Sequence, residues 1–139
     1  MAVVVAGCSE DAPPATIDDP AFVRDANRVC ERSVPGLRAP ERDNSDTTAL
    51  TAERLGEVAD GLEGVAGRLR QVPVSAAAAG QVDAWLDDWD RFVTVGRRYA
   101  AAVEADDPER YSRIDDEAVT LARRMGRFAR GNGIDDCVL

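Results

Sequence analysis

The sequence contains no histidine and no lysine, and all 17 of its basic residues are arginine. Histidine is the commonest ligand at haem, copper, catalytic-zinc and bundle di-iron sites, so its absence argues against each of them. Without histidine, the Ser–His and Cys–His pairs of nucleophilic enzymes cannot form. We therefore expect no catalytic residues, no metal ligands and no cofactor, and we predict that the protein is not an enzyme.

Further absences narrow the possible partners. No phosphate-binding loop of the G-x-x-x-x-G-K type is present, and beyond the N-terminus no segment is apolar enough to span a bilayer as a helix. The net charge of −9 argues against nucleic acid as a partner, because binding to phosphates needs a basic surface. The abundance of Ala, Gly, Val, Asp and Arg, which GC-rich codons favour, indicates a high-GC bacterium such as an actinomycete.

Near the N-terminus, the order of Val5, Ala6, Gly7 and Cys8 is aliphatic, small, glycine and then cysteine. This pattern resembles the lipobox of bacterial lipoprotein signal peptides. The resemblance implies that residues 1–8 are the remnant of a signal peptide and that Cys8 is lipidated. Burying an acyl chain in a bilayer contributes about 0.8 kcal/mol per methylene. The resemblance thus implies a membrane partner, reached through a lipid anchor at the outer face of the cell membrane.

The residues before Cys8 differ from a complete signal peptide, which has a positively charged start and about 7–15 apolar residues. Met1 to Gly7 has neither feature. Two alternatives follow: the true start lies upstream of Met1, or the protein is cytoplasmic with an apolar N-terminal end. Residues 9–19 are rich in acidic residues and proline, and Ile17 is their only large apolar residue. They are therefore predicted to form a flexible acidic tether.

The remaining residues, 20–139, are predicted to form one domain. Asp19-Pro20 and Asp107-Pro108 each place a capping carboxylate before a proline, which is typical of a helix start. Apolar residues then recur at spacings of three and four. The expected helices cover about residues 20–33, 48–71, 75–105 and 108–131. Short links between the later helices favour an all-α, antiparallel, up-down-up-down four-helix bundle.

Cys30 and Cys137 remain once Cys8 is assigned to lipid, and an even number of cysteines in an exported chain suggests one disulfide. In such a bundle the first helix begins where the fourth ends. The residues after Gly131 are long enough to bring Cys137 back to Cys30. The sequence therefore predicts a Cys30–Cys137 disulfide. The alternative is a pair of free thiols in a cytoplasmic bundle.

This layout also resembles a group of small secreted or lipid-anchored helical-bundle proteins of actinobacteria. The matching features are the segment 26–30 with its cysteine, the helix that contains Trp85, and Cys137 near the end. The resemblance implies a fold and a location but no activity.

The third helix carries the residues that suggest a ligand site. Trp85, Trp89 and Tyr99 lie on its inner face, and Gly96 leaves a gap between them. We expect both tryptophans to be buried in the core. The alternative is that the four residues wall a pocket for a small apolar ligand. The acidic clusters of the chain are interpreted as solvated helix faces, because carboxylates on an exposed helix diverge and form no metal cage.

The third and fourth helices should meet in a definite register. Their link is centred near Asp106, so facing residues of an antiparallel pair have numbers that sum to about 212. Asp88 and Arg124 flank the two apolar faces and satisfy this sum, which predicts a salt bridge between them.

Two functions remain open at this stage. The first is a non-enzymatic cell-envelope lipoprotein that acts as an interaction, structural or sensory module. The second is a carrier that binds a small apolar ligand inside the bundle. The sequence does not specify a protein partner.

Overall fold

The computed structural model describes residues 15–37 and 51–139. The lipobox, including Cys8, and residues 9–14 of the expected tether lie outside these ranges. Within them the chain forms four α-helices: α1 (Pro20–Ser33), α2 (Ala52–Arg70), α3 (Ala79–Glu104) and α4 (Pro108–Gly131). A short 3₁₀ helix, η1 (Asp135–Cys137), follows near the C-terminus. The described part of the chain contains no strand.

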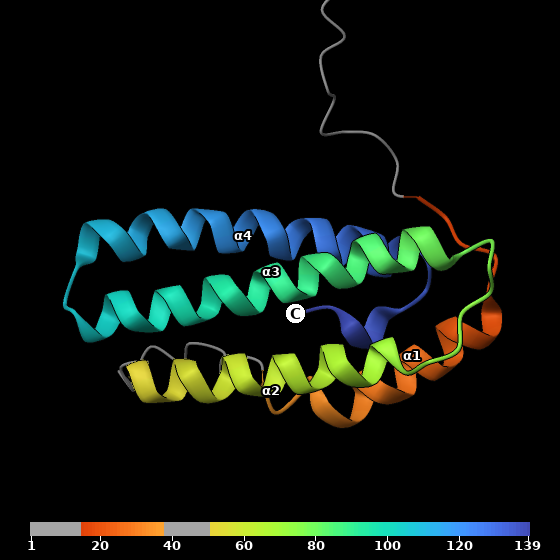
Figure 1. Cartoon of the computed structure of the whole chain (residues 1–139), viewed down its shortest axis with the longest axis horizontal. Coiled ribbons are helices and arrows are strands. Elements are labelled where there is room, and N and C mark those ends of the chain that lie inside the picture. The colour runs from red at the N-terminus through yellow and green to blue at the C-terminus, as the bar shows by residue number, and fades with distance from the viewer. Residues whose placement is uncertain (1–14, 38–50) are drawn as a thin grey trace, which may run out of the picture.

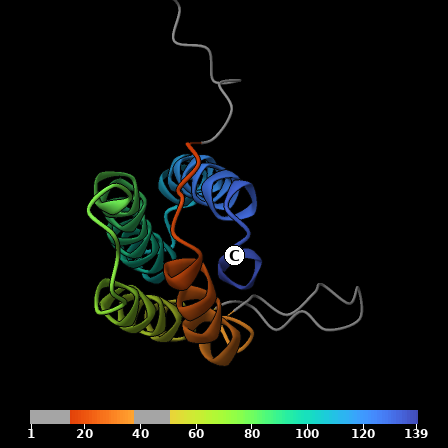
Figure 2. The same ribbon diagram turned by 90° about the vertical axis from the view of Figure 1, so that its right-hand side faces the viewer.

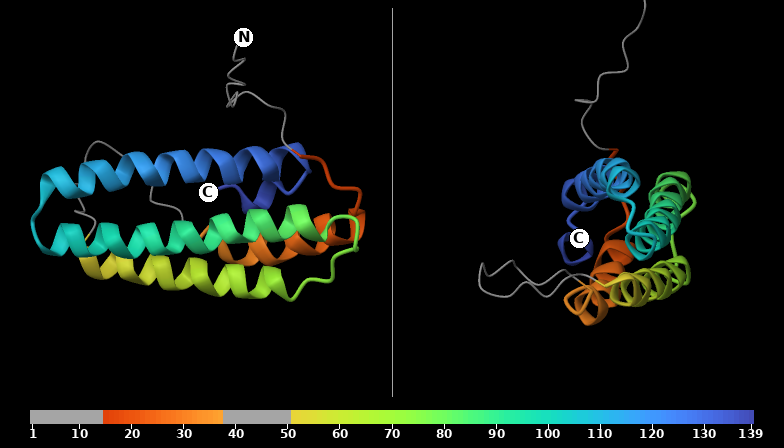
Figure 3. Two further views of the ribbon diagram at one scale, coloured as in Figure 1. Left: turned by 45° about the horizontal axis from the view of Figure 1, so that its top comes forward. Right: turned by 90° about the vertical axis from the view of Figure 1, so that its left-hand side faces the viewer.

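The helices alternate in direction along one axis, so the expected up-down-up-down bundle is confirmed (Figure 1). Helix α3 packs against both α2 and α4. Helix α1 has 14 residues and α3 has 26, so α1 lines only part of the bundle's length (Figure 3). The other part of the bundle is built from α2, α3 and α4 among the described elements.

Three of the helix starts follow from their capping residues. The carboxylates of Asp19 and Asp107 accept hydrogen bonds from the backbone N–H groups of Phe22 and Arg110, both at 3.0 Å, as expected of N-caps. The expected start of the second helix at residue 48 is wrong. Thr51 has an extended backbone, and its hydroxyl accepts the Arg54 N–H at 3.1 Å, so α2 begins after it.

The expected start of the third helix at Ser75 is also wrong. The backbone N–H groups of Ala78 and Ala79 both bond to the Ser75 carbonyl, which makes residues 75–78 a turn before α3 begins. The Ser75 N–H instead donates to the Asp19 carboxylate at 2.7 Å. Asp19 therefore holds the start of α1 and the α2–α3 connection at the same place.

The core is divided into two clusters of apolar side chains. The larger one joins α1, α2, α3, α4 and the C-terminal tail around Phe22, Leu69, Trp89 and Ile134, all of them fully buried. The smaller cluster lies between α3 and α4, around Val95, Ala102, Ile114 and Leu121. Val95, Ala102 and Ile134 do not belong to the apolar three- and four-residue spacing from which the helices were predicted.

The C-terminal tail returns to α1, and the predicted Cys30–Cys137 disulfide is present, with a Cα–Cα distance of 5.0 Å. Gly133 makes the reversal possible because its φ of +71° is open to glycine at little cost. The tail then places η1 between α1 and α4, as Figure 2 shows end-on. Asn27 of α1 also holds the tail: its side chain donates to the Gly133 carbonyl at 2.8 Å and accepts the Asp136 N–H at 3.1 Å.

The last residues of the expected tether belong to the folded domain. The side chain of Asn132 accepts the Ile17 N–H at 2.8 Å and donates to the Ala15 carbonyl at 2.9 Å. Ile17 also packs against the larger core cluster. Hydrogen bonds between the Asn132 side chain and the backbone thus tie Ala15 and Ile17 to the bundle, and the composition of the segment did not reveal these contacts.

Candidate binding site between α3 and α4

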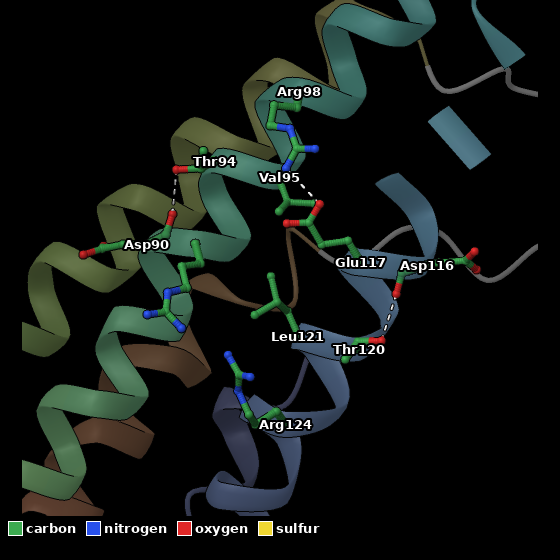
Figure 4. Close-up of a pocket in the computed structure, with 10 residues that line it drawn as sticks. Asp90, Thr94, Val95, Arg98, Asp116, Glu117, Thr120, Leu121 and Arg124 are labelled. Atoms are coloured by element: carbon green, nitrogen blue, oxygen red, sulfur yellow. Dashed lines mark hydrogen bonds and ion pairs between the residues drawn. The ribbon is translucent and has the colours of Figure 1, made fainter. Parts of the chain in front are cut away.

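The largest hollow among those described lies between α3 and α4, and Figure 4 shows the side chains around it. We call it the polar groove. Its volume is about 670 Å³. The buried residues Val95 and Leu121 contribute its apolar surface, and Thr94 and Thr120 flank them. Its charged lining residues are Asp90, Arg91, Arg98, Asp116, Glu117 and Arg124.

The polar groups of this groove are largely paired with one another. Arg98 forms an ion pair with Glu117 across the two helices at 2.8 Å. The hydroxyls of Thr94 and Thr120 each donate to a backbone carbonyl one turn earlier in their own helix, both at 3.0 Å. A ligand in the polar groove would therefore have to replace interactions that the protein already makes. The arrangement favours cohesion of α3 and α4 over tight capture of a charged ligand.

The predicted Asp88–Arg124 salt bridge is confirmed and lies at the edge of the polar groove. The guanidinium forms two hydrogen bonds to the carboxylate, one of them from Nε to Oδ2 at 2.6 Å. Asp88 is only 8% exposed, so the pair is more buried than a surface salt bridge. The hydrogen bond to Asp88 raises the pKa of Arg124 above its usual value. Arg91, one turn further along α3, adds a second cation 3.5 Å from the same carboxylate.

Charges on the other side of α3 connect it to α2. Arg70 forms ion pairs with Asp87 and Asp90, and Arg97 pairs with Glu63 at 2.8 Å. The hydrogen bonds from Arg97 hold the pKa of the Glu63 carboxyl below its usual value. The acidic residues around Asp88 on α3 thus form ion pairs with arginines of both α2 and α4. These ion pairs link the three helices.

A second hollow of about 380 Å³ lies on the same α3–α4 seam, and Arg124 lines both hollows. We call it the aromatic hollow. It is lined by Ala15, Gly80, Gln81, Ala84, Trp85, Asp88, Arg124, Arg127 and Phe128. The rings of Trp85 and Phe128 stack with their centroids 5.3 Å apart. The Asp88–Arg124 pair therefore stands at the junction of a charged groove and a more apolar hollow.

The structure does not gather the four expected pocket residues around one hollow. Trp85 is 3% exposed and Trp89 is fully buried, as expected of core residues, and their rings meet edge to face at 5.9 Å. Of the four, only Trp85 lines a described hollow. A Cβ on Gly96 would lie 3.7 Å from the Cβ of Ala59, so this glycine faces α2. Tyr99 packs against Tyr111 near the smaller core cluster.

Both tryptophans carry a buried polar group. The indole Nε1–H groups of Trp85 and Trp89 have no hydrogen-bond acceptor within the described residues. Buried donors of this kind are uncommon in folded proteins. In Trp85 the group belongs to a side chain that also lines the aromatic hollow.

Two residues of α4 that complete this hollow, Arg127 and Phe128, were not predicted from the sequence as site residues. A usable signal lay in α3, where Gly80, Ala84 and Asp88 follow one another at spacings of four. Residues at this spacing share one helix face, and two small residues in succession leave room beside a neighbouring helix. The apolar spacing of three and four residues identifies only the large side chains of a helix face, so it did not predict a space between two helices.

The structure gives no sign of a metal centre or of a membrane-spanning helix in residues 15–37 and 51–139. No group of three or more Cys, Asp or Glu side chains there is placed to hold a metal ion. None of the helices in the same ranges is long and apolar enough to cross a membrane. No protein family, curated protein or solved structure matches this chain. The function is therefore inferred from the residues and their geometry alone.

Proposed function

We propose that this protein is a cell-envelope lipoprotein, anchored through Cys8 to the outer face of the cell membrane, and that its bundle is a non-enzymatic interaction, structural or sensory module. The observation that carries the proposal is the Cys30–Cys137 disulfide. Disulfides persist in oxidising compartments outside the cytoplasm and are rare in cytoplasmic proteins of mesophiles. Both cysteines are buried, which favours a permanent structural role over a redox function.

The place where the N-terminal segment joins the fold supports an anchor on the same side. Ala15 is bound by Asn132, next to the end of α4. Ala15 lies seven positions after Cys8 in the sequence, and this length of chain spans at most about 25 Å. A lipid on Cys8 would hold this end of the bundle close to the bilayer. The net charge of −9 gives the bundle no electrostatic attraction to anionic lipid, so attachment depends on the acyl chains.

The anchor is tested by detergent phase partitioning. The gene is expressed in its own host with its native upstream sequence, beside a Cys8→Ser variant. The wild-type protein should enter the detergent phase and the variant should stay in the aqueous phase, because only a thiol at position 8 accepts the lipid. Recovery of both proteins in the aqueous phase would refute the lipoprotein assignment. Mass spectrometry of the N-terminal peptide identifies the acyl group.

The aromatic hollow favours a second candidate function, a carrier that binds a small apolar ligand. Hollows of this size, with apolar walls and a few convergent polar groups, are typical of ligand sites. A ligand that binds only the folded protein raises its melting temperature. A thermal-shift screen with lipids and small aromatic compounds therefore separates a carrier, which some of them stabilise, from a module that binds only proteins.

A further inference from the structure

We propose that a hollow between α1 and α2 binds a small oxyanion of the phosphate type, an anion with at least two negative charges. The proposal goes beyond the function proposed above, because it depends on neither the lipid anchor nor the aromatic hollow. It gives the bundle a ligand of defined chemistry at a site that the preceding candidates do not use.

The hollow lies where the second half of α1 packs beside α2, two helices that Figure 2 shows next to each other. We call it the arginine hollow. Its volume is about 280 Å³, and it is lined by Arg28, Val29, Arg32, Ser33 and Arg68. All three charged lining residues are arginine, in a chain whose net charge is −9. Sites for small molecules have volumes of roughly 300–1,000 Å³, so the arginine hollow suits a compact ligand.

Two of the three guanidinium groups form no ion pair with a described residue. Arg32 has no ionic partner there, and Arg68 donates instead to the neutral hydroxyl of Ser33 at 2.8 Å. Arg28 and Arg32 are four positions apart on α1, so they share one helix face. Like charges at this spacing destabilise a helix slightly, and an anion between them would remove that cost.

The carboxylate closest to the hollow does not neutralise it. Asp25 lies 3.5 Å from Arg28, but it already accepts two hydrogen bonds from Arg24, at 2.8 and 3.1 Å. The helix ends add little negative charge, because the C-terminus of a helix carries only about half an elementary charge. Even two such ends leave most of the charge of three guanidinium groups without a counter-charge.

The donors around the arginine hollow match the acceptors of a phosphate group. The N–H groups of arginine form a fixed fork that binds two oxygens of an oxyanion at once. The Ser33 hydroxyl accepts from Arg68 and keeps its own O–H, which has no acceptor among the described residues. A phosphate group offers several oxygens to these donors. Three positive charges around one hollow favour an anion that carries at least two negative charges.

Phosphate groups occur both in soluble small molecules and in the headgroups of a bilayer, and the hollow would recognise the same group in either. The charge of the whole chain favours the soluble source. A net charge of −9 repels a broad anionic membrane surface. A small anion inside the hollow interacts mainly with the charges nearest to it, because physiological salt screens charges beyond about 8 Å.

Binding is measured by isothermal titration calorimetry of the full chain with Cys8→Ser, using sodium pyrophosphate as the probe at low ionic strength. We expect one pyrophosphate per protein, weaker binding of inorganic phosphate, and a loss of affinity when sodium chloride is added, since salt screens exposed charges. Absence of saturable pyrophosphate binding would overturn the proposal. Tighter binding of polyglutamate than of pyrophosphate would also overturn it, in favour of an acidic peptide.

The site is tested with matched arginine variants. Arg32→Gln and Arg68→Gln should each raise the Kd of pyrophosphate about threefold to tenfold, and the double variant should raise it more than either. Arg123→Gln on α4 changes the net charge by the same amount, at an exposed position that lines no described hollow, and it should have no effect. The three arginines are exposed, so the circular dichroism of all variants should match that of the parent protein. Equal Kd values for Arg32→Gln and Arg123→Gln would overturn the site.

The arginine Nε–H signals in a ¹⁵N–¹H correlation spectrum locate the probe. Pyrophosphate should shift the signals of Arg32 and Arg68 and leave that of Arg123 in place. Similar shifts at all arginines would show diffuse counter-ion binding and would overturn the arginine hollow as a site.

Co-sedimentation with phosphatidylglycerol vesicles distinguishes the two sources of phosphate. The Cys8→Ser protein should bind pyrophosphate and stay in the supernatant of the vesicles. Vesicle binding beside pyrophosphate binding, with both weakened by Arg32→Gln, would support the hollow and add the headgroup as a second source. Vesicle binding that needs Arg32, without any binding of pyrophosphate, would overturn the soluble ligand in favour of the headgroup.

Discussion

Opening the Cys30–Cys137 disulfide should lower the free energy of unfolding by several kcal/mol without unfolding the protein. The two cysteines are 107 residues apart. The loss of loop entropy in the unfolded chain assigns a cross-link over this separation about 4.7 kcal/mol, and typical measured values are about 2–4 kcal/mol. A small domain has about 5–15 kcal/mol in total, so the bridge supplies a large share of it.

The folded state should tolerate the loss because other contacts hold the tail. Ile134 is fully buried, and Asn27 forms two hydrogen bonds with the backbone of the tail. The tail is therefore held at Gly133, Ile134 and Asp136, all directly before Cys137. We expect the reduced protein to keep its helical circular dichroism at 25 °C while its Tm falls by roughly 10–20 °C.

Urea unfolding of the oxidised and reduced forms, in a Cys8→Ser background, measures the difference directly. Reduction keeps both sulfur atoms in the core, whereas the double variant Cys30→Ala/Cys137→Ala also removes their volume and should be somewhat less stable than the reduced protein. Adding reductant to the double variant must change nothing. Equal midpoints for the oxidised and reduced chains would refute the reasoning, and non-reducing peptide maps would then show whether the bridge had formed at all.

Three further predictions concern single side chains. In a double-mutant cycle, Asp88→Asn and Arg124→Gln should show a coupling of about 1–3 kcal/mol in the free energy of unfolding, because the pair is bidentate and partly buried. Additive effects of the two substitutions would show that the salt bridge does not stabilise the fold. Asp19 has a pKa below its usual value because backbone N–H groups donate to it, so its stabilisation is present near neutral pH and is lost as the pH falls through the lowered pKa. Asp19→Asn should therefore destabilise the protein at pH 7 and reduce the difference between pH 7 and pH 3 in urea melts, while the exposed control Asp18→Asn should do neither. Gly96→Ala should be tolerated or raise the stability by up to about 1 kcal/mol, whereas Gly96→Leu should cost about 1–3 kcal/mol by forcing α2 and α3 apart; similar melting curves for the two variants would contradict a close helix contact there.

Much of the fold was predictable because the helix-start residues and the apolar spacing along the chain both favoured the same four-helix bundle. The Asp-Pro pairs at residues 19–20 and 107–108 fix two helix starts within one residue, and a constant residue sum across an antiparallel link located the Asp88–Arg124 pair. The two incorrect starts have a common cause. Thr51 caps α2 and Ser75 begins a turn, and their hydrogen bonds depend on backbone conformation and, for Ser75, on the distant carboxylate of Asp19.

The candidate site was less predictable because it depends on space rather than on residue type. A helical seam of large apolar residues suggests that Trp85, Trp89, Gly96 and Tyr99 act together. In the fold they divide between two core clusters and the contact with α2. The hollow instead depends on where α4 places Phe128 relative to the small residues of α3, and only the packed helices determine that.

The clamp formed by Asn132 has a consequence for the topology of the chain. It joins the segment at Ala15 to the end of α4, and the disulfide joins α1 to the tail, so the described chain is closed on itself twice. A closed chain has no preferred point of opening. A circularly permuted protein, with a linker joining its original ends and new ends cut at the tight α3–α4 link around Asp106, should therefore keep the same bundle. A single backbone cut between α1 and α2 would likewise leave the two fragments covalently joined.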